Sequence, residues 1–496
     1  MNLATIIDGH PADDVALVSR GQTTDYGTLR AQVAGLRGGF GALGLEPGDR
    51  LAIVAGNNWY FVVSYLAALG AGLVAVPLNP SNPAAALAHE LREVGAAAVV
   101  LGPSARAAFE EIDRSTLPSV RHVIGAGFSP EDGLHLDDLA SAEPRPLVDR
   151  EPSDTAVLIF TSGTAGAPRA AMLTHANLLT NIKQALASGG DVQTSDDVAF
   201  GLLPMFHIFG LNVVLGVTLA VGARVVLIER FDPVSALETI QMHAITIVSG
   251  PPTMWAAFAG IPGADPEVLS SVRLAVSGAA KLPVEVGQAI EARYGLHLDE
   301  GYGLTEASPV VCSPTGTDAP PGSVGIPVPG VELRLVDADG ADVLVGDAGE
   351  LLVKGPNVFV GYWDDPEATA RVLTEDGWLR TGDVAVVDDD GYLFIVDRAK
   401  DLIIVSGFNV FPAEVEEVLL EHPAIEACAV VGVPHPHTGE SVKAYVKARS
   451  GISVEEDDVI TFCAERLARY KCPNKVWFVD DIPRGLGGKV LRRLLS

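Results

Sequence analysis

The sequence predicts a large α/β region followed by a small α+β domain, and three observations lead to this fold class. From about residue 15 to about residue 350, short apolar runs alternate with Ala- and Leu-rich stretches of helical period, a pattern typical of parallel sheets with crossover helices. Past Gly322 the runs shorten and are joined by Asp-Gly and Pro-Gly turns, which indicates an antiparallel β subdomain. After residue 400, strand and helix patterns mix in a compact segment.

Six apolar runs are the predicted strands of the parallel sheets. They are RLAIVAG at 50–56, GLVAVPL at 72–78, AAAVVLG at 96–102, RVVLIE at 224–229, ITIVSGPP at 245–252 and RLAVSGAA at 273–280. Several of these runs end in Gly or Pro. Because ligands bind at the carboxyl ends of the strands in such sheets, we expect a small-molecule site at this edge.

The C-terminal segment is predicted to form a separate α+β unit. Its expected elements are a helix over Pro412–Leu420, strands over 427–433 and 441–448, a helix over Glu455–Leu467 and a final strand. We place the domain boundary at Asp397–Lys400, which divides the chain into residues 1–397 and 398–496.

The composition indicates a globular protein whose partners are small molecules. The chain has 496 residues, of which 48% are hydrophobic and 20% charged, and its formal net charge is −29. Such a charge argues against nucleic acid or an anionic membrane surface as the main partner. Residues 461–496 are the exception, because eight basic and three acidic residues give them a charge of +5. This segment is either a solvated helix face or a site for a polyanionic cofactor.

Cysteine usage and the N-terminus favour a reducing compartment. The four cysteines form no C-x-x-C pair, so neither a zinc cluster nor a disulfide framework is indicated. The start MNLATIIDGHPADD lacks the features of a signal peptide, and the apolar stretch Leu202–Ile228 is interrupted by polar residues and glycines. We expect a cytoplasmic protein without an integral membrane segment, either a monomer or a homodimer.

The stretch LIFTSGTAGAPRAAMLTH, residues 158–175, runs from an apolar strand into a loop rich in Thr, Ser and Gly. Glycine permits the φ values that let successive backbone amides converge on an anion. Phosphate is therefore the first ligand to consider, although ordinary polar surface loops have the same composition. The usual P-loop is excluded, because Gly163 is followed five places later by Pro168 and then by Arg169.

Five segments occur in one order along the chain. They are TSGTAGAPRAAMLTH at 161–175, LPMFHIFG at 203–210, EGYGLTEASP at 300–309, the stretch 377–416 that begins GWLRTGD, and IPRGLGGKVLRR at 482–493. With these segments, the sequence closely resembles the acyl-CoA synthetase branch of the adenylate-forming superfamily over essentially its whole length. The resemblance implies two doubly wound α/β subdomains plus a β subdomain, followed by a small mobile domain that carries a catalytic lysine.

The resemblance also implies an AMP-forming acid–thiol ligase that uses ATP, Mg²⁺ and coenzyme A. A carboxylic acid reacts with ATP to give an acyl-adenylate and pyrophosphate, and the thiol of CoA then attacks the mixed anhydride. The loop would wrap the outer phosphates of ATP with its backbone amides and with the hydroxyl groups of Thr161, Ser162 and Thr164 around Gly163.

Two positions of this loop depart from the family pattern. The family usually has Thr where Ala165 stands, and Lys-Gly where Arg169 and Ala170 stand. Arginine keeps the positive charge but presents a planar fork in place of a point ammonium. We expect altered, but not abolished, handling of pyrophosphate.

The resemblance assigns further residues to the nucleotide. Tyr302 stacks on adenine, and Thr305 serves the α-phosphate. Thr161 and Glu306 hold Mg²⁺, a hard cation that prefers oxygen ligands. The other implied nucleotide residues are Gly278, Ala279, Ala280, Glu300, Gly301, Gly303 and Ile395.

Asp383 is implied as the acceptor for the two ribose hydroxyl groups, a role that suits a carboxylate because it only accepts, and Arg398 touches the same ribose. His207 borders the substrate carboxylate and the thiol tunnel as a gate, and is counted among the catalytic residues.

Lys489 is implied to bridge the carboxylate and the α-phosphate during adenylation, where its charge offsets that of two anionic reactants. Lys400 occupies the hinge position, and the swing of the small domain would bring Ser406 and Gly407 to the pantetheine tunnel. The basic C-terminal segment would then help to receive the phosphates of CoA.

The stretches expected to line the acyl pocket are nearly devoid of charge, which favours an apolar acid without an amino group. A medium- to long-chain fatty acid is our first expectation. Trp255 and Met254 would instead suit a shorter or aryl acid if they close the pocket, as in 4-coumarate- or succinylbenzoate-type ligases. A catalytically silent nucleotide-binding relative is the alternative from another class.

Overall fold

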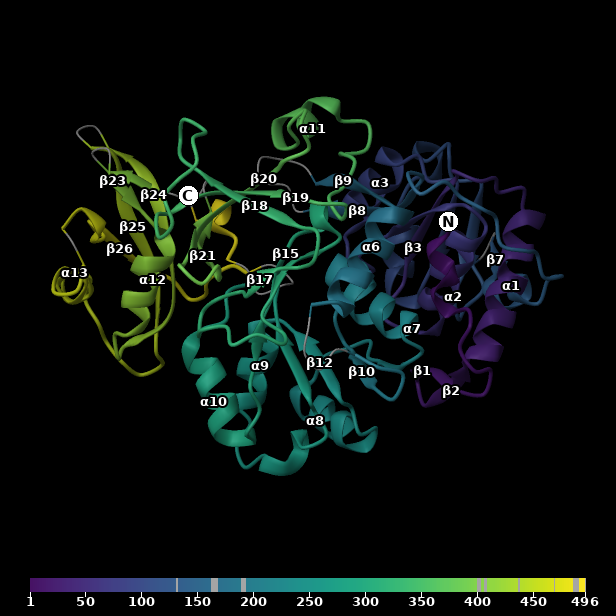
Figure 1. Ribbon diagram of the computed structural model, residues 1–496, viewed down its shortest axis with the longest axis horizontal. Coiled ribbons are helices and arrows are strands. Elements are labelled where there is room, and N and C mark those ends of the chain that lie inside the picture. Colours follow the sequence, from purple (N-terminus) through teal and green to yellow (C-terminus); the bar gives the residue numbers. More distant parts are fainter. Residues whose placement is uncertain are drawn as a thin grey trace. The chain divides into compact units, whose positions relative to one another are not determined.

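The computed structural model describes residues 1–130, 133–161, 168–188, 193–398, 403–405, 408–435, 438–467, 469–484 and 490–495 (Figure 1). The chain divides into two compact units. The first contains Met1–Gly278, Leu282–Glu332 and Val353–Leu379, and the second contains Ala279–Lys281, Leu333–Leu352 and Arg380–Ser496. The boundary predicted after residue 397 concerns a hinge, which a division by contacts does not measure, and it stays a prediction.

A seven-stranded sheet with the order β7-β6-β5-β3-β4-β8-β9 forms one half of the α/β architecture. Its strands are β3 (Arg50–Val54), β4 (Val74–Pro77), β5 (Ala98–Leu101), β6 (His122–Gly125), β7 (Leu134–His135), β8 (Thr155–Thr161) and β9 (Arg169–Thr174). Neighbours are parallel except for the β8–β9 pair. β4 and β5 are buried along their whole length, as expected for a sheet covered on both faces.

A second seven-stranded sheet has the order β14-β13-β12-β10-β11-β1-β2. Its strands are β1 (Val15–Ser19), β2 (Gln22–Asp25), β10 (Val198–Gly201), β11 (Arg224–Leu227), β12 (Ile247–Gly250), β13 (Leu274–Ser277) and β14 (Asp299–Glu300). Only the β1–β2 pair is antiparallel. All six predicted strand runs are confirmed, as β3, β4, β5, β11, β12 and β13, and the two sheets confirm the expected pair of α/β subdomains.

Helices connect these strands. The α-helices of the first unit are α1 (Tyr26–Ala42), α2 (Trp59–Gly70), α3 (Ala84–Glu93), α4 (Arg106–Glu110), α5 (Leu136–Ala140), α6 (His175–Leu186), α7 (Thr218–Ala220), α8 (Pro233–Met242), α9 (Pro252–Ala259), α10 (Val284–Tyr294) and α11 (Pro366–Val372). Short 3₁₀ turns are η1 (Leu3–Ile7), η2 (Pro103–Ala105), η3 (Arg114–Thr116), η5 (Pro266–Leu269) and η6 (Thr305–Ala307). The helix starts are encoded locally: Asn58 caps α2, and Thr174 forms a capping box with Asn177 at α6.

The apolar stretch Leu202–Ile228 contains the helix η4 (Phe209–Val217), the short helix α7 and then the mostly buried strand β11. The helix η4 is a π-helix rather than an α-helix, a form that is frequent at functional sites. In the ranges that the structure describes, no helix combines the length and the apolar character needed to cross a bilayer.

Two smaller sheets follow. β15 (Tyr302–Gly303), β16 (Val310–Ser313) and β17 (Ile326–Pro327) are antiparallel neighbours. β18 (Glu332–Val336), β19 (Gly349–Lys354), β20 (Leu379–Val387) and β21 (Leu393–Arg398) form a four-stranded sheet in this order. The turn between β20 and β21 contains Gly391 at φ 88°, which glycine adopts without strain. The antiparallel region expected past Gly322 is confirmed.

The last sheet has the order β23-β22-β25-β24, with β26 paired parallel to β25. Its elements are β22 (Ile403–Val405), β23 (Phe408–Val410), α12 (Pro412–Leu420), β24 (Ile425–His435), β25 (Gly439–Ala448), α13 (Glu456–Ala464), η8 (Arg469–Lys471), β26 (Lys475–Phe478) and η9 (Arg492–Leu494). The predicted helix over Pro412–Leu420 is confirmed at both ends. The predicted second helix is shorter at its C-terminal end than expected.

Each α/β sheet has its own apolar core. Leu87 and Leu91 of α3 pack with Val99 of β5 in the first core, and Trp255 and Phe258 of α9 lie in the second. In Figure 1 the helices α8, α9 and α10 gather beside β12.

Candidate active site

The carboxyl ends of β12, β13 and β14 lie next to one another, as the sequence predicts. In the parallel register Gly250 pairs with Ser277, and Ser277 pairs with Glu300. Backbone hydrogen bonds continue past the strands, from Gly278 N to Gly250 O at 3.2 Å and from Gly301 N to Ser277 O at 3.0 Å. Three predicted nucleotide residues, Gly278, Glu300 and Gly301, therefore occupy one edge of the sheet.

The next predicted residues stand on the loop after β14. Tyr302 and Gly303 form β15, and Thr305 and Glu306 lie on η6. Gly303 has to be glycine, because a Cβ atom there would lie 2.3 Å from the carbonyl oxygen of Pro309. The loop thus folds back closely on itself and holds Thr305 and Glu306 at its turn.

Buried amide side chains hold this turn, and sequence reasoning missed them. Asn212 of η4 donates from Nδ2 to Ser308 O at 2.7 Å, and Asn357 donates from Nδ2 to Ala307 O at 2.8 Å. Both asparagines are at most 2% exposed. The available signal was an asparagine inside an otherwise apolar run, FGLNVV and GPNVF.

The segment 357–365 forms hydrogen bonds with Glu306 within the first unit. Phe359 N donates to the Glu306 backbone oxygen at 2.8 Å, and Tyr362 Oη donates to Glu306 Oε1 at 2.7 Å. The same segment pairs with β9, because Val360 N donates to Met172 O at 3.3 Å. It therefore connects the Glu306 turn to the strand that begins at Arg169.

Thr161 and Arg169 stand opposite each other where the phosphate-loop candidate leaves and rejoins the sheet. They are Cα partners at the end of the β8–β9 hairpin where the connecting loop begins and ends. Arg169 Nε donates to Asp365 Oδ2 at 2.9 Å, and Asp365 Oδ1 accepts from Ala368 N at 2.8 Å to cap α11. The hydrogen bond from Ala368 N, followed by that from Arg169, lowers the pKa of Asp365.

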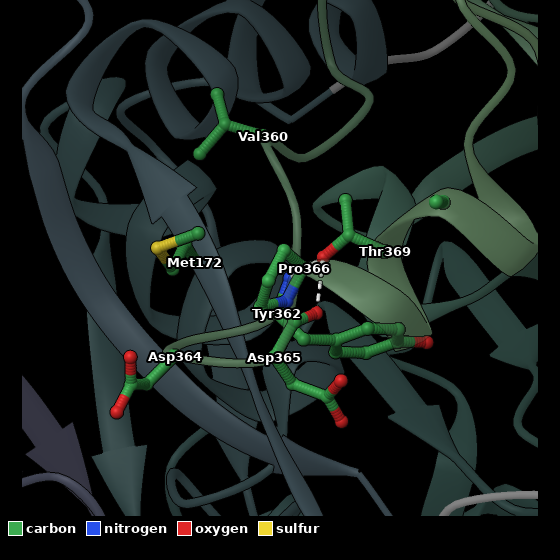
Figure 2. Close-up of a pocket in the computed structure, with 8 residues that line it drawn as sticks. Met172, Val360, Tyr362, Asp364, Asp365, Pro366 and Thr369 are labelled. Carbon is green, nitrogen blue, oxygen red and sulfur yellow. Dashed lines mark hydrogen bonds between the residues drawn. The ribbon is translucent and has the colours of Figure 1, made fainter.

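A cavity of about 400 Å³ opens beside this segment (Figure 2). Its lining residues are Met172, Val360, Tyr362, Asp364, Asp365, Pro366, Thr369 and Ala370. The Thr369 hydroxyl donates to Asp365 O at 2.9 Å. None of these lining residues is basic, so the cavity is not a phosphate pocket, although Tyr362 and Asp365 link it to Glu306 and Arg169.

His207 precedes the π-helix and accepts a hydrogen bond from Phe209 N at Nδ1, at 3.2 Å. Burial lowers the pKa of His207, although its side chain stays accessible to solvent. A neutral ring that accepts through Nδ1 carries its proton on Nε2. The tautomer assigned from this hydrogen bond makes Nε2 a donor, which suits a gate better than a general base.

The Phe209 ring packs against Gly278. A Cβ atom on Gly278 would lie 3.0 Å from Phe209 Cε1, so a larger residue would displace the ring. The absence of a side chain at Gly278 therefore lets an aromatic ring of η4 approach the residue that follows β13.

Asp383 and Arg398 belong to the second compact unit and are cross-strand Cα partners in β20 and β21. Asp383 is 4% exposed, and its backbone N donates to Thr381 Oγ1 at 3.0 Å. Ile395 pairs with Ala385 in the same two strands. The two residues expected at the ribose are thus neighbours in the sheet.

The remaining predicted site residues either follow β13 or lie outside the described residues. Ala279 and Ala280 follow β13 and are grouped with the second unit, Ala279 with a φ of 69°. Seven predicted residues lie outside the described residues: Ser162, Gly163, Thr164, Lys400, Ser406, Gly407 and Lys489.

Several basic residues of the C-terminal segment are paired with glutamates. Lys471 Nζ donates to both carboxylate oxygens of Glu414 at 2.6 and 2.8 Å, and Arg492 Nη2 donates to both oxygens of Glu416 at 2.8 Å. These contacts neutralise part of the +5 charge locally. A role of these two residues in receiving CoA phosphates would require the pairs to open.

The donor set around Glu306 fits Mg²⁺ held together with phosphate. Among the described residues, no group of three or more His, Cys, Asp and Glu side chains could form a protein cage for a metal. Mg²⁺ is usually bound by one or two carboxylates plus substrate phosphates. One anchored carboxylate on a turn beside the phosphate-loop hairpin matches that chemistry.

Two family models match the chain. The model described as AMP-binding enzyme matches residues 3–363, and the model described as AMP-binding enzyme C-terminal domain matches residues 414–489. Together the models cover the α/β sheets and most of the C-terminal sheet.

Two curated relatives are named as enzymes that form acyl-CoA thioesters. A long-chain-fatty-acid–CoA ligase of Bacillus subtilis is 36% identical over 91% of this chain and 86% of its own length. A feruloyl-CoA synthase of an Amycolatopsis species is 38% identical over 95% of this chain and 93% of its own. The crystal structure of ATP-bound MatB from Rhodopseudomonas palustris superposes with a TM-score of 0.91, at 34% identity, over 100% of this chain and 98% of that one.

Proposed function

Because the chain belongs to the AMP-binding enzyme family, in its acyl-CoA synthetase branch, we propose that it activates an apolar carboxylic acid, with a medium- to long-chain fatty acid as the first candidate. The chain is an AMP-forming acid–CoA ligase, and such ligases use ATP, Mg²⁺ and CoA. The observation that carries the assignment of the site is the segment 357–365, which bonds to Glu306 on one side and to β9 on the other.

In the proposed adenylation site, the outer phosphates of ATP lie in the loop between Thr161 and Arg169. Glu306 and Thr161 would hold Mg²⁺, which would neutralise phosphate charge when bound. Thr305 contacts the α-phosphate, and Tyr302 stacks on adenine beside the edge of β13. The arrangement is supported by the cross-strand pairing of Thr161 with Arg169.

The proposed ribose site lies on the second unit, where Asp383 accepts from both hydroxyl groups and Arg398 stands beside it. Lys489 bridges the acid and the α-phosphate in the first half-reaction. The part of the chain after residue 397 then turns about Lys400, so that Ser406 and Gly407 complete the tunnel for the pantetheine arm.

The proposed acyl pocket lies on the side of η4, where Phe209 packs against Gly278. Trp255 is buried in the core: its side chain is 0% exposed, and Nε1 donates to Val276 O at 3.4 Å. Met254 is buried as well, with its side chain over Gly250. Burial alone does not test whether either side chain borders the acyl pocket, so their role in selecting a shorter or aryl acid stays a prediction.

An aryl acid is the second candidate, because the feruloyl-CoA synthase relative is as similar to this chain as the fatty-acid ligase relative is. His207 serves either acid in the same way, as a neutral donor at Nε2. We also propose that the enzyme works in the cytoplasm on free acid and CoA, as a monomer or homodimer.

The test is pyrophosphate release from ATP with a panel of acids, run with and without CoA. Octanoate, palmitate, ferulate and succinylbenzoate separate the substrate classes. The proposal expects release with the two fatty acids and thioester formation when CoA is added. Preference for ferulate would replace the fatty-acid assignment, and no release with any acid would indicate a catalytically silent relative.

A further inference from the structure

The phenol of Tyr362 donates a hydrogen bond to the Glu306 carboxylate, at 2.7 Å from Oη to Oε1. We propose that Tyr362 is a positioning residue that sets the orientation of the Glu306 carboxylate for Mg²⁺. This inference rests on the proposed function, which gives Glu306 the metal. Tyr362 itself is not expected to touch ATP or the acid.

The backbone of Tyr362 is held from two sides. Its N–H donates to Thr369 Oγ1 at 2.9 Å, and the residue forms an antiparallel bridge with Ala171 of β9. One residue further on, Trp363 N donates to Ala170 O at 2.8 Å. The position of the phenol is therefore set by β9, the strand that starts at Arg169.

The ring of Tyr362 is packed as well. It meets the Phe359 ring edge to face, with 5.0 Å between the centroids, and Phe359 N in turn donates to the Glu306 backbone oxygen at 2.8 Å. The segment thus holds the main chain of Glu306 through Phe359 and its side chain through Tyr362. Two contacts from one rigid segment leave the carboxylate few orientations.

The chemistry of the pair suits a fixed donor. The phenol donates from Oη to one carboxylate oxygen, Glu306 Oε1. A carboxylate offers about four lone-pair sites on two oxygens. A donor on Oε1 therefore orients the group and leaves it able to bind a cation. Partners of this kind orient metal ligands and raise affinity for the metal.

The variant Tyr362→Phe removes only the hydroxyl. We expect the Mg²⁺ concentration for half-maximal adenylation to rise by about 10- to 100-fold, the range found when such partners are lost, with the maximal rate recovered at high Mg²⁺. Thioester formation from supplied acyl-adenylate should be unchanged. As a readout besides activity, Mn²⁺ binding in the presence of a non-hydrolysable ATP analogue, measured by electron paramagnetic resonance, should weaken by a similar factor.

Tyr26→Phe is the matched control, because Tyr26 is another buried phenol with one hydrogen bond, to Ala223 O at 2.7 Å. A merely structural role predicts that Tyr362→Phe and Tyr26→Phe behave alike, with no shift in Mg²⁺ dependence, and this outcome overturns the inference.

The variant Glu306→Gln distinguishes a failure of the positioning role of Tyr362 from a failure of the metal assignment of Glu306. If it alters Mg²⁺ dependence and Tyr362→Phe does not, only the positioning role fails. If Glu306→Gln leaves Mg²⁺ dependence unchanged, the metal assignment in the proposed function fails, and the inference fails with it.

Discussion

His175 is expected to destabilise the first unit in acid. Its side chain is 1% exposed, and Nδ1 accepts a hydrogen bond from Leu3 N at 3.0 Å. Burial lowers the pKa of His175 to about 4 from 6.5. Between these values the unfolded chain binds more protons than the folded one, so stability is complete above pH 6.5 and falls as the pH drops toward 4.

The size of the effect follows from the two pKa values. At 1.36 kcal/mol per pKa unit, the free energy of unfolding should fall by about 2 kcal/mol between pH 7 and pH 5, and by about 3 kcal/mol in total. Glu90 acts in the opposite direction, because burial raises its pKa to about 7 and protonation at lower pH then favours the folded state. The pH dependence of the wild-type unfolding free energy therefore does not separate the contribution of His175 from that of Glu90.

The assay is urea unfolding of the wild type and of His175→Asn at pH 7 and pH 5. Asparagine does not titrate, so the difference in unfolding free energy between the two proteins should move by about 2 kcal/mol in favour of the variant at pH 5. Glu90→Gln, as a control, should shift the difference in the opposite direction. If the difference between wild type and His175→Asn is the same at both pH values, the histidine is not the acid-sensitive group.

Three further predictions concern the active site. Lys489→Ala should slow adenylation by at least about 100-fold, from lost electrostatic stabilisation, while thioester formation from supplied acyl-adenylate survives; equal losses in both half-reactions, measured by single turnover, would refute this division of labour. Asp365→Asn should keep the cap on α11 and lose only the ion pair with Arg169, since Asn caps as well as Asp does; its unfolding temperature should exceed that of Asp365→Ala, which loses both, and equal unfolding temperatures of the two variants would show that the cap does not contribute. Ala165→Thr should lower the apparent KM for MgATP without changing the preferred acid, and a changed acid preference would contradict the placement of the loop at phosphate.

Much of the fold was predictable because local patterns encode it. The run RLAVSGAA has the apolar, β-branched character of a buried strand and ends in small residues, and it is β13 followed by the edge of the site. The helix over Pro412–Leu420 begins with a proline at its first position, a signal that needs no tertiary context. The π-helix at Phe209 was not predictable, because its apolar pattern does not distinguish it from an α-helix.

The candidate site was predictable where its residues stand in motifs and not where they act through other residues. Glu306 and Arg169 stand in segments that a sequence comparison recognises. Tyr362 and Asp365 carry no such chemical signal of their own, since a tyrosine and an aspartate before a helix are ordinary residues of a turn. Their roles depend on hydrogen bonds to residues 56 and 196 positions away.

The sequence by itself determined the six strand runs of the α/β region, the helix over Pro412–Leu420 and the family, because each of these depends on neighbours along the chain or on short motifs. The tertiary structure decided the rest. Pairing of the segment 357–365 with β9 places the Tyr362 phenol on Glu306 and the Asp365 carboxylate on Arg169. Such contacts form only when distant segments are brought into register, and no local propensity specifies which residues then meet.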